Sequence, residues 1–373
     1  MTHLGILCPG AIGHLNPMCT IARELLSRGH RVTLFGVPDI QARVANVAGL
    51  EFAQLGAAEF PLGAIDRMYK ELGQKSNLDG LKYTLTWMGR ENQMLFAEAP
   101  AAIEARGIDL LLIDQVTGAG TTIAEFLQIP FVTICNALPI NREPSVPPFF
   151  TTWTYQDTWW AKARNQLGNS LLDYLTETVW QQILTQRRSW KLPPLADREA
   201  GFSQLLQISQ LPPEFDFPRQ GAAQMHYVGP FLAPATAEPI SFAGLDFPFD
   251  RLTAKPLIYA SLGTLQNQQL DIFKTIASAC VDLDAQLVIS LGIPIAIRPR
   301  SNLMANRLWW LMPPMPPSSL DRVWSSLTLA SIPPSAASAR ACPSSPSQLP
   351  TSNQGLPPAS SALAQGNWYR SSN

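Results

Sequence analysis

The sequence predicts an α/β protein with two doubly wound domains, the second of them incomplete. In roughly the first 140 residues, near-continuous apolar runs alternate with amphipathic helical stretches, which is typical of a parallel sheet covered on both faces. A second, shorter round of the same pattern begins at residue 257. After Gly292 both periodicities are lost, and Pro and Ser dominate.

Strands are expected at the short apolar runs, and helices where apolar residues recur at helical spacing. The expected strands of the first domain are residues 3–9, 31–36, 51–55, 109–113, 131–135, 205–209 and 225–228. Its expected helices are residues 15–28, 40–48, 80–105, 120–127 and about 167–190. In the second domain, strands 257–261 and 286–291 flank a helix at 270–283.

Composition sets the expected domain boundaries. We expect a first domain over residues 1–231, a Pro- and Ala-rich linker over 232–254 and a partial second domain over 255–300. Residues 301–373 contain no lysine and one acidic residue, Asp321, among dense Pro and Ser. Such a segment cannot supply a hydrophobic core, so we expect a disordered tail.

Overall charge and hydropathy restrict the partners and the compartment. The chain has 373 residues, of which 46% are hydrophobic and 15% charged, and its net charge is −1. This balance gives no reason to expect nucleic acid as a partner. No signal peptide is recognisable, and no apolar run reaches the ~18 residues of a membrane span. We therefore expect a cytoplasmic protein whose five cysteines are reduced.

Two polar residues are expected at the carboxyl edge of the first sheet, where doubly wound folds bind ligands. His14 follows the first strand and a glycine turn formed by Gly10 and Gly13, and Asp114 follows the apolar run 109–113. If the two strand ends lie close together, Asp114 can accept a hydrogen bond from one nitrogen of His14, and the other nitrogen can act as a base. The alternatives are that His14 only packs or caps a helix and that Asp114 caps the next helix.

Four motifs follow one another along the chain: G-H-x-x-P (Gly13, His14, Pro17), Asp114 after the fourth strand, V-G-P-F (228–231) and S-L-G-T (261–264). In this order they resemble those of the family-1 UDP-glycosyltransferases, which have the GT-B fold. The resemblance covers about residues 3–292 and is nearest to the bacterial branch that includes zeaxanthin and macrolide glycosyltransferases.

The resemblance implies inverting transfer of a hexose from a UDP-sugar, with UDP-glucose the expected donor, to a hydroxyl group. By this resemblance His14 would be the general base, and Asp114 would orient and stabilise it. Ser261, Gly263 and Thr264 would contact the diphosphate, and neither a metal nor another cofactor is implied. The first domain would bind the acceptor and the second the sugar nucleotide.

An aromatic-rich stretch over residues 138–160 is expected to be a loop, and it includes Phe149, Phe150, Trp153 and Trp159. These rings would suit a pocket for a hydrophobic alcohol such as a carotenoid, a sterol or a polyketide. A second interpretation is that they pack the long helix onto the sheet. A third is that the loop makes peripheral contact with a membrane, because Trp favours that interface. The sequence leaves the three open.

The second half departs from the family pattern. After Gly292 the expected H-x-G-x-x-S/T-x-x-E segment and the final D/E-Q pair are absent. Read one base out of frame, residues 323–333 can spell V-V-I-T-H-A-G-L-N-T, and residues 308–314 can spell V-V-A-Y-A-P. We therefore predict a frameshift between about residues 292 and 308, which would leave sugar transfer weak or absent.

Two other functions compete with sugar transfer. The chain could bind a hydrophobic small molecule without transferring sugar to it. A nicotinamide-dependent oxidoreductase is disfavoured, because the first glycine turn lacks the G-x-G-x-x-G fingerprint.

Overall fold

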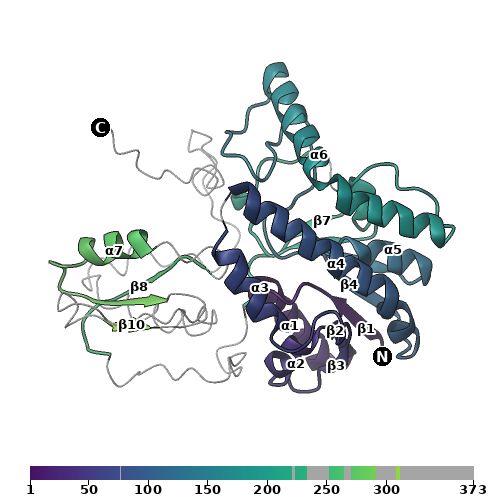
Figure 1. Cartoon of the computed structure of the whole chain (residues 1–373), viewed down its shortest axis with the longest axis horizontal. Coiled ribbons are helices and arrows are strands. Elements are labelled where there is room, and N and C mark those ends of the chain that lie inside the picture. Colours follow the sequence, from purple (N-terminus) through teal and green to yellow (C-terminus); the bar gives the residue numbers. More distant parts are fainter. Residues whose placement is uncertain (76, 221–222, 233–251, 264–269, 291–307, 311–373) are drawn as a thin grey trace, which may run out of the picture. The chain divides into compact units, whose positions relative to one another are not determined.

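The computed structural model describes residues 1–75, 77–220, 223–232, 252–263, 270–290 and 308–310. The chain divides into two compact units (Figure 1). The first unit includes residues 1–64 and 81–231, and the second includes residues 65–80 and 232–355. The GT-B expectation of two α/β halves is met, since each unit has its own parallel sheet.

The first unit is built on a seven-stranded parallel sheet with the order β3-β2-β1-β4-β5-β6-β7. Its strands are β1 (His3–Leu7), β2 (Arg31–Gly36), β3 (Glu51–Gln54), β4 (Leu110–Asp114), β5 (Phe131–Cys135), β6 (Gln207–Ser209) and β7 (Met225–Tyr227). The chain runs outward from β1 in one direction and from β4 in the other, so the strand order reverses between them. Leu7 is in register with Ile113, and the carboxyl ends of β1 and β4 therefore lie side by side.

Helices cover both faces of this sheet. They are α1 (Ile12–Ser27), α2 (Pro38–Val44), α4 (Asn77–Glu104), α5 (Ala119–Phe126) and α6 (Trp159–Ser189), with 3-10 turns at Glu199–Gly201 and Pro213–Phe215. Helix α3 (Ala64–Gly73), beyond its first residue, and the first residues of α4 fall in the stretch 65–80, which belongs to the second unit. Figure 1 shows α4, α5 and α6 on one side of the sheet and α1 and α2 on the other, as right-handed crossovers require. None of the described helices is long and apolar enough to cross a membrane.

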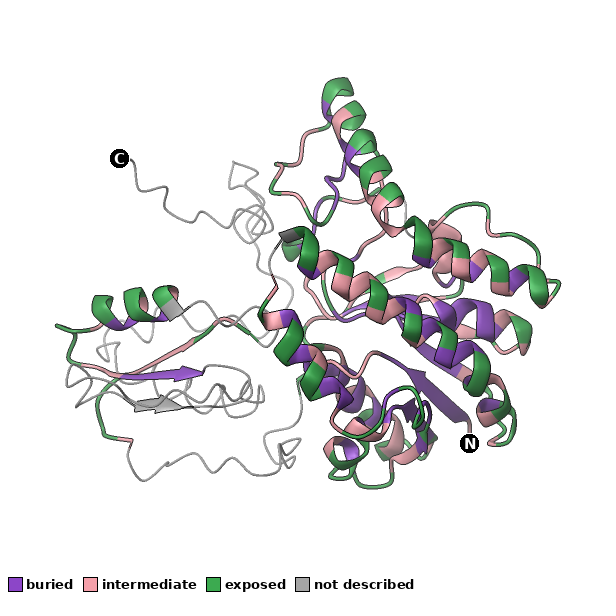
Figure 2. Ribbon diagram, in the orientation of Figure 1, coloured by how far each residue is buried: buried purple, intermediate pink, exposed green. Residues whose placement is uncertain are grey.

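The core of the first unit lies between the central strands and these helices. All five residues of β1 are buried, as are four of the five in both β4 and β5 (Figure 2). Gly120 brings α5 close to β4, since a Cβ atom there would lie only 2.4 Å from Cγ2 of Ile113. This close packing fixes the end of β4, where Asp114 stands.

The helix starts of the first domain differ from the prediction by one to about eight residues, and helix α3 was not predicted; two of the differences concern α1 and α6. Helix α1 begins at Ile12 and includes Gly13 and His14 in its first turn, so Gly13 is not part of a turn before the helix. Helix α6 begins at Trp159, well before the predicted start near residue 167. Its first turns bury Ala161, an asparagine and a glycine while leucines point to solvent, so the hydrophobic pattern could not reveal the helix.

The second unit contains a three-stranded parallel sheet in the order β10-β9-β8. The elements are β8 (Leu257–Ser261), α7 (Leu270–Ala279), β9 (Gln286–Ser290) and β10 (Leu308–Trp310). Phe273 and Ala277 of α7 pack on Leu287 and Ile289 of β9 in a small core. Strand β10 falls within residues 301–373, which were predicted to be a disordered tail. The rest of that segment, most of the predicted linker and Thr264 lie outside the described residues.

Candidate active site

His14 and Asp114 meet at the point where the strand order reverses. His14 lies in the first turn of α1, directly beyond β1, and Asp114 is the last residue of β4. Nδ1 of His14 lies 2.7 Å from Oδ2 of Asp114. Since an ionised carboxylate only accepts hydrogen bonds, Nδ1 is the donor and Nε2 of the neutral ring carries the free lone pair. The His14 side chain is 25% exposed, so Nε2 is the nitrogen available to a ligand.

The carboxylate of Asp114 is buried and held by three donors. Besides His14, Nδ2 of Asn136 donates to Oδ2 over 2.6 Å, and the backbone N–H of Val116 donates to Oδ1 over 2.9 Å. The N-cap of α5 is Gly118, and it receives no side-chain hydrogen bond, so Asp114 does not cap that helix. The carboxylate is thus fixed in the orientation that binds the imidazole ring.

Asn136 is the residue of this site that the sequence analysis missed. It directly follows β5, just as Asp114 ends β4, and both belong to the same edge of the sheet. The signal that found Asp114, a polar residue at the end of an apolar strand, would also have found Asn136. An asparagine is less conspicuous there than a carboxylate because it carries no charge.

Charge and burial act in opposite directions on His14. Burial lowers its pKa, but the hydrogen bond and charge of Asp114, together with the charge of Glu91, raise it, and the net pKa lies above the ordinary value of 6.5. Glu91 of α4 is itself perturbed: burial raises its pKa to about 7, with Asp114 adding to the rise and His14 opposing it. Burial and the charge of Asp114 also raise the pKa of the Cys8 thiol, so that Cys8 stays neutral.

We predict that the midpoint of the His14 titration, followed by NMR, lies above pH 6.5. His14 is protonated below this midpoint, so it is available as a base only above it. Asp114→Asn removes the charge that favours the imidazolium, and the midpoint should fall below that of the parent chain. A midpoint that did not move in this variant would show that Asp114 does not act on His14.

The predicted donor residues belong to the second unit. Ser261 ends β8 and is exposed, and the backbone N–H of Gly263 lies 3.2 Å from its Oγ. Gly263 has φ = +77°, a conformation that favours glycine over other residues. Ser261 and Gly263 thus share one turn, while Thr264 lies outside the described residues. No cluster of His, Cys, Asp and Glu suited to a metal ion occurs in the described part of the chain.

The four predicted acceptor residues have different surroundings. Trp153 packs on α6, with the Arg164 guanidinium 4.7 Å from its ring centre and its indole against Gly168. Phe149 and Phe150 form an edge-to-face pair with ring centres 5.9 Å apart, and they are 50% and 45% exposed. Trp159 is 81% exposed at the start of α6. Trp153 thus packs against the long helix, as the second interpretation expected, whereas the rings of Phe149, Phe150 and Trp159 are exposed and could contact a ligand.

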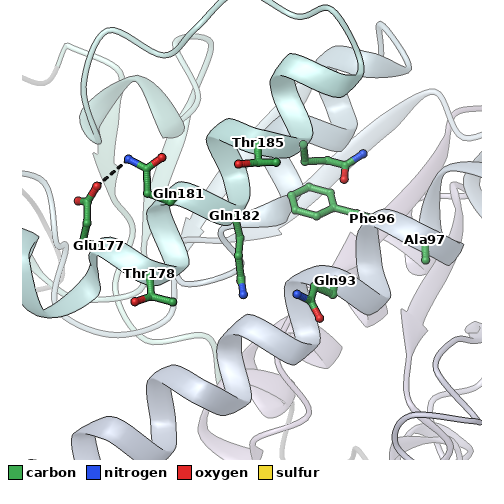
Figure 3. A pocket seen from close by; sticks show the side chains of 9 residues that line it. Gln93, Phe96, Ala97, Glu177, Thr178, Gln181, Gln182 and Thr185 are labelled. Carbon is green, nitrogen blue, oxygen red and sulfur yellow. Dashed lines mark hydrogen bonds between the residues drawn. The ribbon is translucent and has the colours of Figure 1, made fainter.

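A groove lies between α4 and α6 and has a volume of about 720 Å³ (Figure 3). It is lined by Gln93, Phe96, Ala97, Glu177, Thr178, Gln181, Gln182, Thr185 and Gln186. Most of its lining residues carry amide, hydroxyl or carboxylate groups, whose aliphatic parts contribute to the surface, and Phe96 is the aromatic residue among them. This chemistry differs from the aromatic lining that the sequence predicted for an apolar acceptor.

Curated relatives of this chain include two zeaxanthin glucosyltransferases. No family model matches the chain. A zeaxanthin glucosyltransferase of Pantoea ananas is 33% identical over 294 residues, which is 78% of this chain and 66% of the relative. A second zeaxanthin glucosyltransferase, from Pseudescherichia vulneris, is 32% identical over 294 residues, with 78% of this chain and 67% of the relative covered. The chain thus spans about two thirds of the length of each relative.

A solved structure gives the same picture of the fold. The crystal structure of the glycotransferase of kitacinnamycin matches with a TM-score of 0.59 and 17% identity, and the match covers 84% of this chain and 71% of the other. At this identity the likeness concerns the fold alone.

Proposed function

Since the chain belongs to the family-1 glycosyltransferases of the GT-B type, as a relative of the zeaxanthin glucosyltransferases, we propose that it is built to transfer a hexose, with inversion, from a UDP-sugar to the hydroxyl of a hydrophobic small molecule. One observation carries this proposal. The His14 ring is held through Nδ1 by Asp114 at the carboxyl edge of the sheet, which leaves Nε2 without a hydrogen bond to Asp114 on a side chain that is 25% exposed. A neutral, oriented imidazole of this kind is a general base.

The proposed reaction is a single displacement at the anomeric carbon. Nε2 of His14 accepts the proton of the acceptor hydroxyl while its oxygen forms the new bond to the sugar. The bond between the anomeric carbon and the diphosphate oxygen breaks, and UDP leaves with the electron pair. Asp114 stabilises the imidazolium that forms. Base catalysis of this type contributes ~10²–10⁴-fold to the rate.

Ser261, Gly263 and Thr264 are the proposed diphosphate contacts. An S-L-G-T turn at the carboxyl end of β8 offers hydroxyl groups and backbone N–H groups, and these can bind phosphate oxygens without a metal ion. UDP-glucose is the donor that the resemblance favours. The family segment that would complete this site is absent from the sequence after Gly292.

The proposed acceptor is a hydrophobic alcohol such as a carotenoid, a sterol or a polyketide. Both relatives are named for zeaxanthin. In this chain Phe149, Phe150 and Trp159 present exposed aromatic surface, which suits an apolar ligand or the membrane in which such a ligand dissolves. Peripheral membrane contact through these rings is part of the proposal.

The missing donor segment favours a second function for the chain as translated, namely acceptor binding with weak or no sugar transfer. Resequencing of codons 285–373, with the DNA read in all three forward frames, tests whether a frameshift explains the missing segment. A shifted frame that continues the family pattern without a stop would show a frameshifted glycosyltransferase. If no frame does so, the frameshift explanation is wrong.

Acceptor binding is tested by quenching of tryptophan fluorescence with zeaxanthin in detergent micelles. We expect the chain to bind zeaxanthin and to bind UDP weakly or not at all. Phe149→Ala combined with Phe150→Ala should weaken binding several-fold, because each change removes an exposed ring. Phe126→Ala is the matched control, since Phe126 is 40% exposed but lies on α5, where it stacks on Trp190. Equal losses in both variants would exclude the Phe149–Phe150 pair as the acceptor contact.

A further inference from the structure

We propose that Asn136 is a positioning residue that limits the basicity of His14 by acting through Asp114. This inference rests on the proposed function for its catalytic meaning, but it can be tested without any sugar transfer. It assigns a role to a residue that neither touches the reacting atoms nor belongs to the motifs identified in the sequence.

The geometry places two donors on one carboxylate oxygen. Oδ2 of Asp114 accepts from Nδ1 of His14 at 2.7 Å and from Nδ2 of Asn136 at 2.6 Å. The carboxylate can only accept, so the amide group that faces it must be the NH₂ group. Both hydrogen bonds therefore draw on the same negative charge.

Asn136 is itself held in place. It is 7% exposed, it directly follows β5, and its backbone carbonyl accepts a hydrogen bond from the side-chain amide of Gln210. Its Nδ2 also lies 3.5 Å from the backbone oxygen of His14. The amide thus connects the ends of β4 and β5 with the first turn of α1.

The carbonyl oxygen of the Asn136 side chain shows that the hydrogen bond to Asp114 determines how the amide is oriented. Oδ1 of Asn136 is buried and has no hydrogen-bond partner among the described residues. An asparagine that served only to fill the core would be expected to pair both its donor and its acceptor. Here the donor is used on Asp114 and the acceptor is left unpaired, so the contact with Asp114 accounts for the orientation of the side chain.

Because His14 and Asn136 share Oδ2 of Asp114, Asn136 affects how tightly His14 holds its proton. A second donor spreads the negative charge of Asp114, so the carboxylate attracts the proton of His14 less strongly. Without Asn136, the imidazolium would be favoured further, and His14 would be free to act as a base only at higher pH. The other ionisable groups that act on this pair are Glu91 from α4, Cys8 beyond β1 and Cys135 on β5.

The test is the pH titration of His14 by NMR in the full chain, with the His14 signal assigned by its loss in His14→Gln. Asn136→Leu keeps the approximate volume but removes the donor, and it should raise the titration midpoint by about half to one pH unit, which is a three- to tenfold tighter hold on the proton. Asn136→Asp replaces the donor by a second carboxylate and should raise the midpoint further.

Asn165→Leu is the matched control. Asn165 is fully buried on α6, and its Nδ2 donates to the carbonyl of Pro144, so it makes no contact with the dyad. This variant should lower the melting temperature, as should Asn136→Leu, but it should leave the His14 midpoint unchanged. A midpoint in the Asn136 variants that is unchanged, lowered, or shifted only as much as in the control would overturn the proposal.

The same titration separates this inference from the proposed function. If the midpoint rises as expected but no form of the chain transfers sugar, the coupling from Asn136 to His14 stands and the enzymatic role fails. If sugar is transferred and the midpoint does not move, the enzymatic role stands and Asn136 has only a structural part.

Discussion

His14→Gln is expected to lower kcat/KM for sugar transfer by ~10²–10⁴-fold. Glutamine can still donate a hydrogen bond to Asp114, but it has no basic nitrogen to accept the hydroxyl proton. The measurement uses UDP-glucose and zeaxanthin with a chain in which the family frame is restored beyond residue 292.

A buried histidine away from the His14–Asp114 pair provides the control for this substitution. His3 is 5% exposed, and its Nε2 lies 2.8 Å from Oγ1 of Thr33, at the opposite end of β1 from the dyad. His3→Gln should affect stability but change kcat/KM by only a few-fold. If both variants lost activity equally, or if His14→Gln kept it, His14 could not be the base.

Arg219→Ala is expected to lower the free energy of unfolding of the first unit by ~3–5 kcal/mol. Arg219 and Asp216 form a buried ion pair with an N–O distance of 2.7 Å, and their side chains are 5% and 0% exposed. Arg219 also donates to the backbone oxygens of Pro139 and Asn141, and so anchors the start of the aromatic stretch. Its loss would leave Asp216 buried with fewer partners and would release that segment.

Urea unfolding measures this change, and Arg28→Ala is its control. Arg28 pairs with Glu24 on the surface of α1, with side chains 68% and 61% exposed, and pairs of this kind contribute only ~0.3–0.5 kcal/mol. A similar small loss for Arg219→Ala would mean that the buried pair does not anchor the segment.

The strands of the first sheet and the positions of His14 and Asp114 at its edge could be predicted from the sequence because each depends on a local signal. Apolar runs gave the strands of the first sheet, and the acidic residue after residues 109–113 placed Asp114 at the sheet edge. The rule that ligand sites lie where strand ends meet made a pairing with His14 one of two possibilities, helix capping by Asp114 being the other, and the hydrogen bond in the structure decided between them.

Other features could not be predicted because their signals are not local. The start of α6 was missed because its buried side consists of Ala161, Asn165 and Gly168, which a search for apolar periodicity ignores. The sequence could not show that Trp153 has a different role from Phe149 and Phe150, because all three are aromatic residues of the same stretch. Only the fold shows that its ring packs on α6 while theirs face solvent.

The central claim has two parts. The chain has the fold of a glycosyltransferase and a histidine, His14, placed to act as the general base, but it lacks the family segment, expected after Gly292, that would bind the donor. The most direct test of this claim compares glucoside formation from UDP-glucose and zeaxanthin by the chain as translated and by the frame-restored chain, with acceptor binding measured for both. We predict equal acceptor binding, with transfer by the restored chain and little or none by the chain as translated. Equal transfer by both chains, or none by the restored one, would contradict the claim.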